Sequence, residues 1–191
     1  MTPETITPEA LSKITKTVTI PPEQAVQALL AAEKIAKKNK SSYSLKDLVG
    51  TWQLRFVTGT KKTRAKAGVV LGAGKYLPKL LKISLTYEAT EDAENRGTVT
   101  NRVDLKLLQL ALSGPVEWLP KQNILAFDFT RLELKLAGIT LYKGYVGSGE
   151  AGETNFYDTG IQKKPFFVYF LVQPSLMAAR GKGGGLAIWV R

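Results

Sequence analysis

Two glycine-rich segments come closest to a chemical motif in this sequence. Residues 147–152 have the spacing G-x-G-x-x-G, which holds a dinucleotide pyrophosphate when a parallel strand precedes it and a helix follows. No helical pattern of useful length follows Gly152, so a flexible hairpin loop is predicted there. Residues 68–75 approach the pattern of a phosphate-binding loop, but the spacing is wrong by one and Tyr76 stands where a Ser or Thr would bind Mg²⁺. Neither segment predicts a nucleotide site.

The chain of 191 residues contains no cysteine and no histidine. It therefore lacks thiol nucleophiles, disulfides, Cys/His zinc sites and every Ser-His or Cys-His mechanism. The remaining acid–base candidates are Asp104, Asp128 and Glu133, and the alternation of residues around each places it on a solvated strand face. We expect no catalytic constellation, no metal and no cofactor, and we interpret the chain as non-enzymatic.

The spacing of apolar residues predicts one helix followed by a mainly β domain. Pro21 and Pro22 suit the first turn of a helix, and apolar residues recur at intervals of three and four from Ala25 to Ala36. Lysines crowd the end of this pattern, where they complement the helix dipole. We predict a lead-in segment over residues 1–22 and a single domain over residues 23–191, a length that can bury a sizeable core.

From Val49 onward apolar and polar residues alternate with a period of two, which is typical of half-buried antiparallel strands. Seven to nine strands with little helix between them indicate an up-and-down barrel or a sandwich, and the sequential hairpin spacing favours a barrel of about eight strands. Such a barrel has room for one small ligand. We predict that ten side chains line its interior: Trp52, Leu54, Phe56, Leu85, Tyr87, Leu125, Phe127, Phe129, Phe167 and Tyr169. The hydroxyls of Tyr87 and Tyr169 are expected to orient the ligand.

Positive charge is concentrated in about a quarter of the chain. The formal net charge is +11, and residues 34–82 hold thirteen Lys or Arg with one acid, Asp47. Such a field favours an anionic partner. We predict that residues 59–82 form a basic lip at the barrel mouth, which lies on anionic lipid while its apolar residues enter the interface. Seven residues are expected to contact the membrane: Lys61, Lys62, Arg64, Lys66, Lys75, Lys79 and Lys82.

The same basic segment leaves other functions open. Trp52, Phe56 and Tyr76 lie among its charges, and stacking aromatics beside cations hold single-stranded nucleic acid. We favour lipid over nucleic acid, because Trp52 and Phe56 share an apolar strand face and no RNA-recognition motif is present. A membrane-docking or assembly protein with a filled barrel is another alternative, and an enzyme acting on an apolar substrate is a third. No apolar run is long enough for a transmembrane helix, and the first twenty residues match neither a signal nor a transit peptide.

Three segments of the chain resemble the plastid lipid-associated proteins, also called fibrillins. Residues 48–58, LVGTWQLRFVT, match the family's opening pattern L-x-G-x-W-x-L-x-aromatic, and residues 98–103, TVTNRV, are similar to its second conserved strand. Residues 179–191 resemble its closing segment, R-G-x-x-G followed by an apolar strand and Arg. The likeness covers about residues 24–191. The family's acidic Tyr-x-Asp stretch is replaced by an apolar segment over residues 169–177, so no role of that acid is carried over.

The resemblance implies a lipocalin-like barrel that binds a lipid or another small apolar molecule, such as a carotenoid, quinone or tetrapyrrole, without catalysis. It also implies peripheral association with photosynthetic membranes or lipid droplets. The location it implies is the cytoplasmic face of a cyanobacterial thylakoid, or a plastid if a transit peptide has been removed. Arg180 in the closing segment is expected to have a structural role, through backbone carbonyls or a carboxylate.

Overall fold

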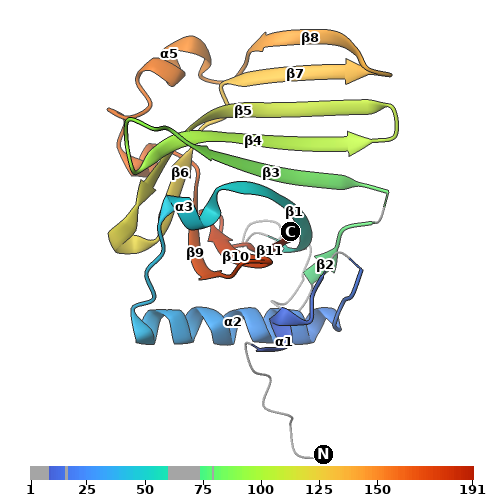
Figure 1. Cartoon of the computed structure of the whole chain (residues 1–191), viewed down its shortest axis with the longest axis vertical. Helices are drawn as coiled ribbons and strands as arrows, with labels where there is room; N and C mark the ends of the chain where they lie inside the picture. The colour runs from blue at the N-terminus through green and yellow to red at the C-terminus, as the bar shows by residue number, and fades with distance from the viewer. Residues whose placement is uncertain (1–8, 16, 60–73, 79) are drawn as a thin grey trace, which may run out of the picture.

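The computed structural model describes residues 9–15, 17–59, 74–78 and 80–191, and a closed antiparallel β-barrel forms its centre (Figure 1). Each barrel strand pairs with the next, and pairing of β4 with β5 closes the ring. The eight barrel strands are β1 (Gly50–Thr58), β3 (Lys82–Ala89), β4 (Arg96–Leu105), β5 (Leu108–Leu119), β6 (Ile124–Phe127), β9 (Phe166–Val172), β10 (Leu176–Gly181) and β11 (Leu186–Val190). The predicted lipocalin-like barrel with an N-terminal helix is confirmed.

The remaining strands extend the sheet of this barrel, and the helices lie around it. Strand β2 (Gly74–Tyr76) pairs with β1, and the hairpin of β7 (Arg131–Leu136) and β8 (Ile139–Tyr145) is added to β5. The helices are α1 (Glu9–Ser12), α2 (Pro22–Asn39), α3 (Leu45–Leu48) and α5 (Gly149–Thr154), with 3₁₀ turns η1 (Pro120–Gln122) and η2 (Ile161–Lys163). Helix α2 begins at the predicted proline pair and lies across one side of the barrel (Figure 1).

Strand β5 changes partner halfway along its length. Its end pairs with β6 over Val116–Leu119, whereas Leu108–Ser113 pairs with β7. The change occurs at Gly114, where a Cβ atom would lie 2.2 Å from the carbonyl oxygen of Asp128, and at Pro115, which has no N–H to donate. Strands β3, β4, β5, β7 and β8 therefore continue past the closed barrel as one extended sheet (Figure 1).

A bulge in β1 corrects the prediction for Phe56. Leu54 pairs with Trp189 and Phe56 with the adjacent Ile188, so β1 carries one extra residue, Arg55, between them. An extra residue reverses the alternation of faces along a strand. Phe56 therefore lies outside the barrel, fully buried in the apolar cluster beneath α2, and Val57 takes the inward position.

The buried face of α2 is held on the barrel by apolar packing and one ion pair. Ala25, Leu29 and Ala32 of the helix share a cluster with outward residues of β10 and β11. Arg180 on β10 donates to both carboxylate oxygens of Glu33 on α2, at 2.8 and 2.5 Å, and to the carbonyl of Gly184 at 2.8 Å. The structural role expected of Arg180 is thus fulfilled by both a carboxylate and a backbone carbonyl.

The glycine-rich segment after β8 is ordered around a short helix, where a flexible hairpin loop was predicted. Helix α5 occupies residues 149–154, and Ser148 before it donates to Asp128 at 2.5 Å. Glu153 on the helix is paired with Arg131 of β7 at 2.9 Å. These contacts fix α5 to the start of the β7–β8 hairpin.

We expect Glu33→Gln to lower the free energy of unfolding at neutral pH by about 1–2 kcal/mol, because it removes a charge-assisted pair. The hydrogen bond from Arg180 holds the pKa of the Glu33 carboxyl below its usual range. The carboxylate therefore contributes stability above its unfolded pKa and loses it as the pH falls through the lower folded pKa. Urea unfolding from neutral to acidic pH should show the two proteins converging in acid.

Glu23→Gln is the matched control, because Glu23 is exposed on the same helix. An equal loss in the two variants, or a difference that does not change with pH, would contradict this account of the ion pair.

Candidate functional site

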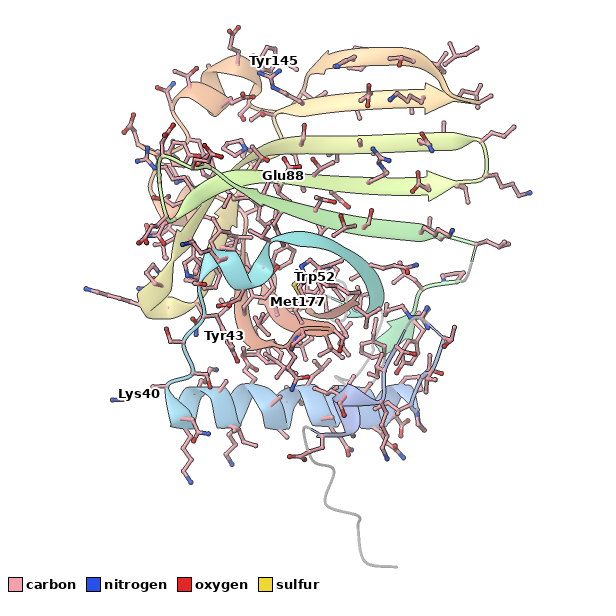
Figure 2. The ribbon with its side chains drawn as sticks, viewed as in Figure 1. Lys40, Tyr43, Trp52, Glu88, Tyr145 and Met177 are labelled. Atoms are coloured by element: carbon pink, nitrogen blue, oxygen red, sulfur yellow. The ribbon has the colours of Figure 1, made fainter. Side chains whose placement is uncertain are left out.

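The closed part of the barrel is filled by its own side chains. Trp52, Trp118 and Tyr169 are at most 2% exposed, and Met177 lies beside Trp52 at the centre (Figure 2). Nine of the ten residues predicted for the interior lie on its inner side. Six belong to the buried interior cluster, namely Trp52, Leu85, Tyr87, Leu125, Phe127 and Tyr169. Leu54, Phe129 and Phe167 pack against that cluster and are half-buried. Their contact with a ligand stays a prediction.

The two interior tyrosines satisfy each other. The hydroxyl oxygens of Tyr87 and Tyr169 lie 2.8 Å apart, and both side chains are buried. Burial raises the pKa of both phenols, so they stay neutral and one hydroxyl donates to the other. A hydroxyl engaged in this way is a weaker candidate for orienting a ligand than the sequence indicated.

One end of the barrel is sealed around Trp52. Its indole N–H donates to the carbonyl of Leu48 at 2.7 Å, and the guanidinium of Arg191 lies 3.8 Å from its ring centroid. Arg191 also donates to the carbonyl of Val49. Gly50, with φ of +112°, leaves room for this arginine, because a Cβ there would lie 3.2 Å from the guanidinium. The first and last strands are thus tied together at this end.

The extended sheet continues the inner face of the barrel as an apolar surface, which we call the open apolar face. Residues directly opposite one another on neighbouring strands form rows on this face. The innermost row, Tyr87 and Val99, is buried in the core. The next row is Leu85, Asn101, Leu112 and Leu132, and the row after it is Ile83, Val103, Leu110, Leu134 and Tyr142. The members of these rows change from buried at Leu85 to exposed at Tyr142.

Apart from Tyr87 and Tyr142, Asn101 is the polar residue in these rows. Its Oδ1 atom is buried and accepts no hydrogen bond from the described residues. Asp104 Oδ1 is also buried without a hydrogen-bond donor among the described residues, but Asp104 lies on the opposite, polar face of β4. A buried acceptor without a donor costs free energy, so Asn101 is a position where a bound molecule would gain a hydrogen bond.

The opposite face of the extended sheet is polar. A cavity of about 340 Å³ on this face is lined by Thr100, Arg102, Ser113, Arg131, Glu133, Lys143 and Tyr145, among others. A second cavity, of about 460 Å³, lies between the end of α2 and β9, and Glu33, Lys37 and Phe170 are among its lining residues. The charges of the first cavity are mixed, with Glu133 and Arg131 both present, so it selects no single charge of ligand.

The predicted basic lip lies mostly outside the described residues. Lys61, Lys62, Arg64, Lys66 and Lys79 fall in undescribed positions. Lys75 on β2 and Lys82 at the start of β3 are described, and both are exposed. No group of His, Cys, Asp or Glu within the described ranges is arranged to hold a metal ion. Among the described helices, none has the length and apolar character needed to span a bilayer.

Apart from Leu85, sequence reasoning missed the residues in the two outer rows of the open apolar face, although a signal was present. Alternate positions from Leu108 to Trp118 are apolar or glycine, which is the pattern of one long strand with an apolar face. Because three of the four residues from Leu105 to Leu108 are leucines and none is a usual turn residue, the turn between β4 and β5 is hidden in the sequence. Comparison with known proteins adds no constraint, since no family model and no curated protein matches this chain.

We expect Tyr87→Phe to lower the free energy of unfolding by about 1–3 kcal/mol, because the hydroxyl of Tyr169 would be left buried without a partner. The double variant Tyr87→Phe/Tyr169→Phe should cost less than the sum of the two single changes. Urea unfolding of the four proteins in a double-mutant cycle measures the coupling. Strictly additive costs would show that each hydroxyl has another partner.

Proposed function

We propose that this protein binds a lipid or another small, largely apolar molecule on its open apolar face, without catalysis, while associated peripherally with a membrane. The observation that carries the proposal is the continuation of the barrel's inner face past the point where the barrel closes. There the apolar rows have no element of the described chain packed over them in the way that α2 covers the other side. Uncovered apolar surface of this kind favours an apolar partner.

The open apolar face is a better site for a ligand than the closed interior of the barrel. Interior residues such as Trp52, Tyr87 and Leu125 are fully buried against one another, and a ligand there would have to displace them. On the open face, contact with the aliphatic rows would contribute roughly 5 kcal/mol for every 200 Å² of apolar surface removed from water. Phe129 lies beside β5 near Gly114, where Thr130 bonds to Ser113, so it would contact the buried end of such a ligand.

Asn101 narrows the chemistry of the ligand. Its unpartnered Oδ1 accepts a hydrogen bond, so the best ligand is a hydrocarbon framework with one hydroxyl or N–H group. A hydroxylated carotenoid, a quinol, a tetrapyrrole or a lipid with a hydroxyl headgroup has this character. The resemblance of residues 24–191 to fibrillins supports the same class of ligand, and with it a place at a thylakoid or plastid membrane or on a lipid droplet.

A filled-barrel docking or assembly protein is the second candidate, and the packed interior favours it. The nucleic-acid alternative is weaker, because two of its three aromatic residues, Trp52 and Phe56, are fully buried and offer no ring for base stacking. The two leading candidates differ in whether a ligand accompanies the purified protein.

The first experiment is ligand identification. The full chain would be produced in a pigmented photosynthetic host, purified without detergent and extracted with organic solvent for absorbance and mass spectrometry. We expect one apolar compound in near-stoichiometric amount. An empty extract would overturn the proposed binding and favour the docking or assembly protein.

We expect Leu112→Glu to weaken binding of the neutral apolar dye N-phenyl-1-naphthylamine at least tenfold, because it places a carboxylate in the second row of the open apolar face. Ser113→Glu is the matched control, since Ser113 is the next residue of β5 and faces the polar side. Fluorescence titration measures both, with circular dichroism to confirm folding. Equal affinities for the two variants would place the dye elsewhere.

Asn101→Leu separates ligand binding from stability. Removing a buried acceptor that lacks a partner should raise the free energy of unfolding, by about 1 kcal/mol. The same change should reduce the amount of ligand that accompanies the protein, because the hydrogen bond to the ligand is lost. Urea unfolding of ligand-free protein and solvent extraction measure the two effects. A variant that is less stable and keeps its ligand would show that Asn101 is structural.

A further inference from the structure

We infer that the leucine-rich end of the extended sheet enters the interface of an anionic lipid bilayer through its two hairpin turns. The inference rests on the proposed membrane association and names the surface responsible. We call this surface the hairpin edge. It consists of the β4–β5 turn (105–108), the β7–β8 turn (136–139) and Leu80, which lies just before β3.

The strand register brings these segments to one end of the sheet. Leu105 is opposite Leu108, Leu108 is also opposite Leu136, and Leu136 is opposite Ile139. Lys82 at the start of β3 is opposite Asp104, next to the first turn. Both turns therefore project side by side from the same end, at the right of the view (Figure 1).

The hairpin edge exposes large apolar side chains to an unusual degree. Leu107 is 66% exposed, Ile139 69% and Leu80 75%. Of the twelve large apolar side chains exposed in the described part of the chain, eight lie at this edge or on the first residues of β8. Single exposed leucines are common, but a contiguous group marks a surface that meets an apolar partner.

The turns themselves depart from what a solvated hairpin requires. Two-residue turns with positive φ favour Asn-Gly or Asp-Gly, because these residues tolerate the left-handed region and are polar. Here Lys106 has φ of 52° and is followed by Leu107, while Ala137 has φ of 49° and is followed by Gly138. Non-glycine residues in this region are strained. In the first turn the exposed Leu107 shares the tip with Lys106, and the second turn, Ala137-Gly138, has no polar side chain at its tip.

The charges around the edge match an anionic bilayer better than a second copy of this basic chain. Lys106 is at the tip of one turn, and Lys82 and Lys135 lie in the row behind it on the polar face. Lysine side chains at this depth reach the headgroups while neighbouring leucines enter the acyl region. Of the nearby acids, Glu133 is paired with Lys135 at 3.2 Å, and Asp104 shares the row of Lys82.

This orientation links the bilayer to the open apolar face. Leu105 and Asn101 are four residues apart on the same face of β4, a distance of about 13 Å along a strand. The one row between them is apolar across β3, β4, β5 and β7, namely Ile83, Val103, Leu110 and Leu134. A ligand leaving the acyl region at the hairpin edge would thus move to Asn101 along a continuous apolar surface.

The test is sedimentation of the full chain with phosphatidylcholine vesicles, with and without phosphatidylglycerol. We expect Leu107→Glu/Ile139→Glu to weaken binding to the anionic vesicles roughly a hundredfold, since each inserted side chain accounts for about a factor of ten. Ile35→Glu/Val49→Glu is the matched control, because both are exposed apolar residues far from the edge in sequence. The control should bind as the wild type does.

A second variant, Leu107→Trp, reports directly whether the hairpin edge enters the bilayer. The three native tryptophans are at most 2% exposed, so Leu107→Trp adds one indole at the hairpin edge. Its emission should shift to the blue on anionic vesicles and be quenched by brominated lipids. Emission that does not change in vesicles that capture the protein would show that the edge stays in water, and would overturn the inference.

The remaining outcomes are also decisive. If Leu107→Glu/Ile139→Glu leaves vesicle binding unchanged, the proposed membrane association is retained and the inference about the hairpin edge is overturned. If the wild type binds no vesicles, both fall, while solvent extraction still tests ligand binding independently. If the wild type is a dimer in analytical ultracentrifugation and the edge variant is a monomer, the surface is occupied by a second copy and the lipid is excluded.

Discussion

The architecture depends on a single strand, β5, which pairs with two different strands along one of its edges. Its second half closes the barrel against β6, and its first half supports the β7–β8 hairpin. The exchange of partners occurs where Gly114 permits a close approach of the Asp128 carbonyl that any side chain would block. Because β5 has twelve residues, it is long enough to complete both pairings without a break. A shorter strand would give a closed barrel with no open apolar face.

The consequence is one continuous apolar surface that is packed at one end and uncovered at the other. At the closed end the surface wraps on itself, and Trp52, Tyr87 and Tyr169 fill the space with their own rings. At the open end the same faces of β4 and β5 have nothing in the described chain packed on them to the same depth. Under the proposed function, stability and binding are therefore separated along one sheet: the closed end supplies the core, and the open end supplies the surface for an apolar partner.

The outer apolar side of the barrel, by contrast, is covered by α2. The bulge at Arg55 turns Phe56 outward, and α2 covers it together with the outer residues of β10 and β11. The pair of Arg180 and Glu33 fixes the helix there, with the pKa of Glu33 lowered by that hydrogen bond. Since α2 covers this side, most of the exposed large apolar side chains in the described part of the chain lie on the extended sheet and its hairpin edge.

The sequence by itself determined the long N-terminal helix and the class of fold. Helical spacing after Pro22 and period-two alternation through residues such as Trp52, Tyr87 and Leu125 predicted a helix and a barrel, because these periods depend only on local backbone geometry. The absence of His and Cys likewise excluded whole mechanisms without any structure.

Tertiary structure alone decided where that pattern is interrupted and which faces stay uncovered. The bulge that moves Phe56 lies between the part of β1 that pairs with β3 and the part that pairs with β2, and no local signal in the sequence marks it. The turn at Lys106 is hidden within an apolar run, since its residues are not those that turns prefer. Leu112 and Asn101 became candidate site residues only when pairing across four strands placed them in one row, a relation between distant segments that alternation along one strand does not contain.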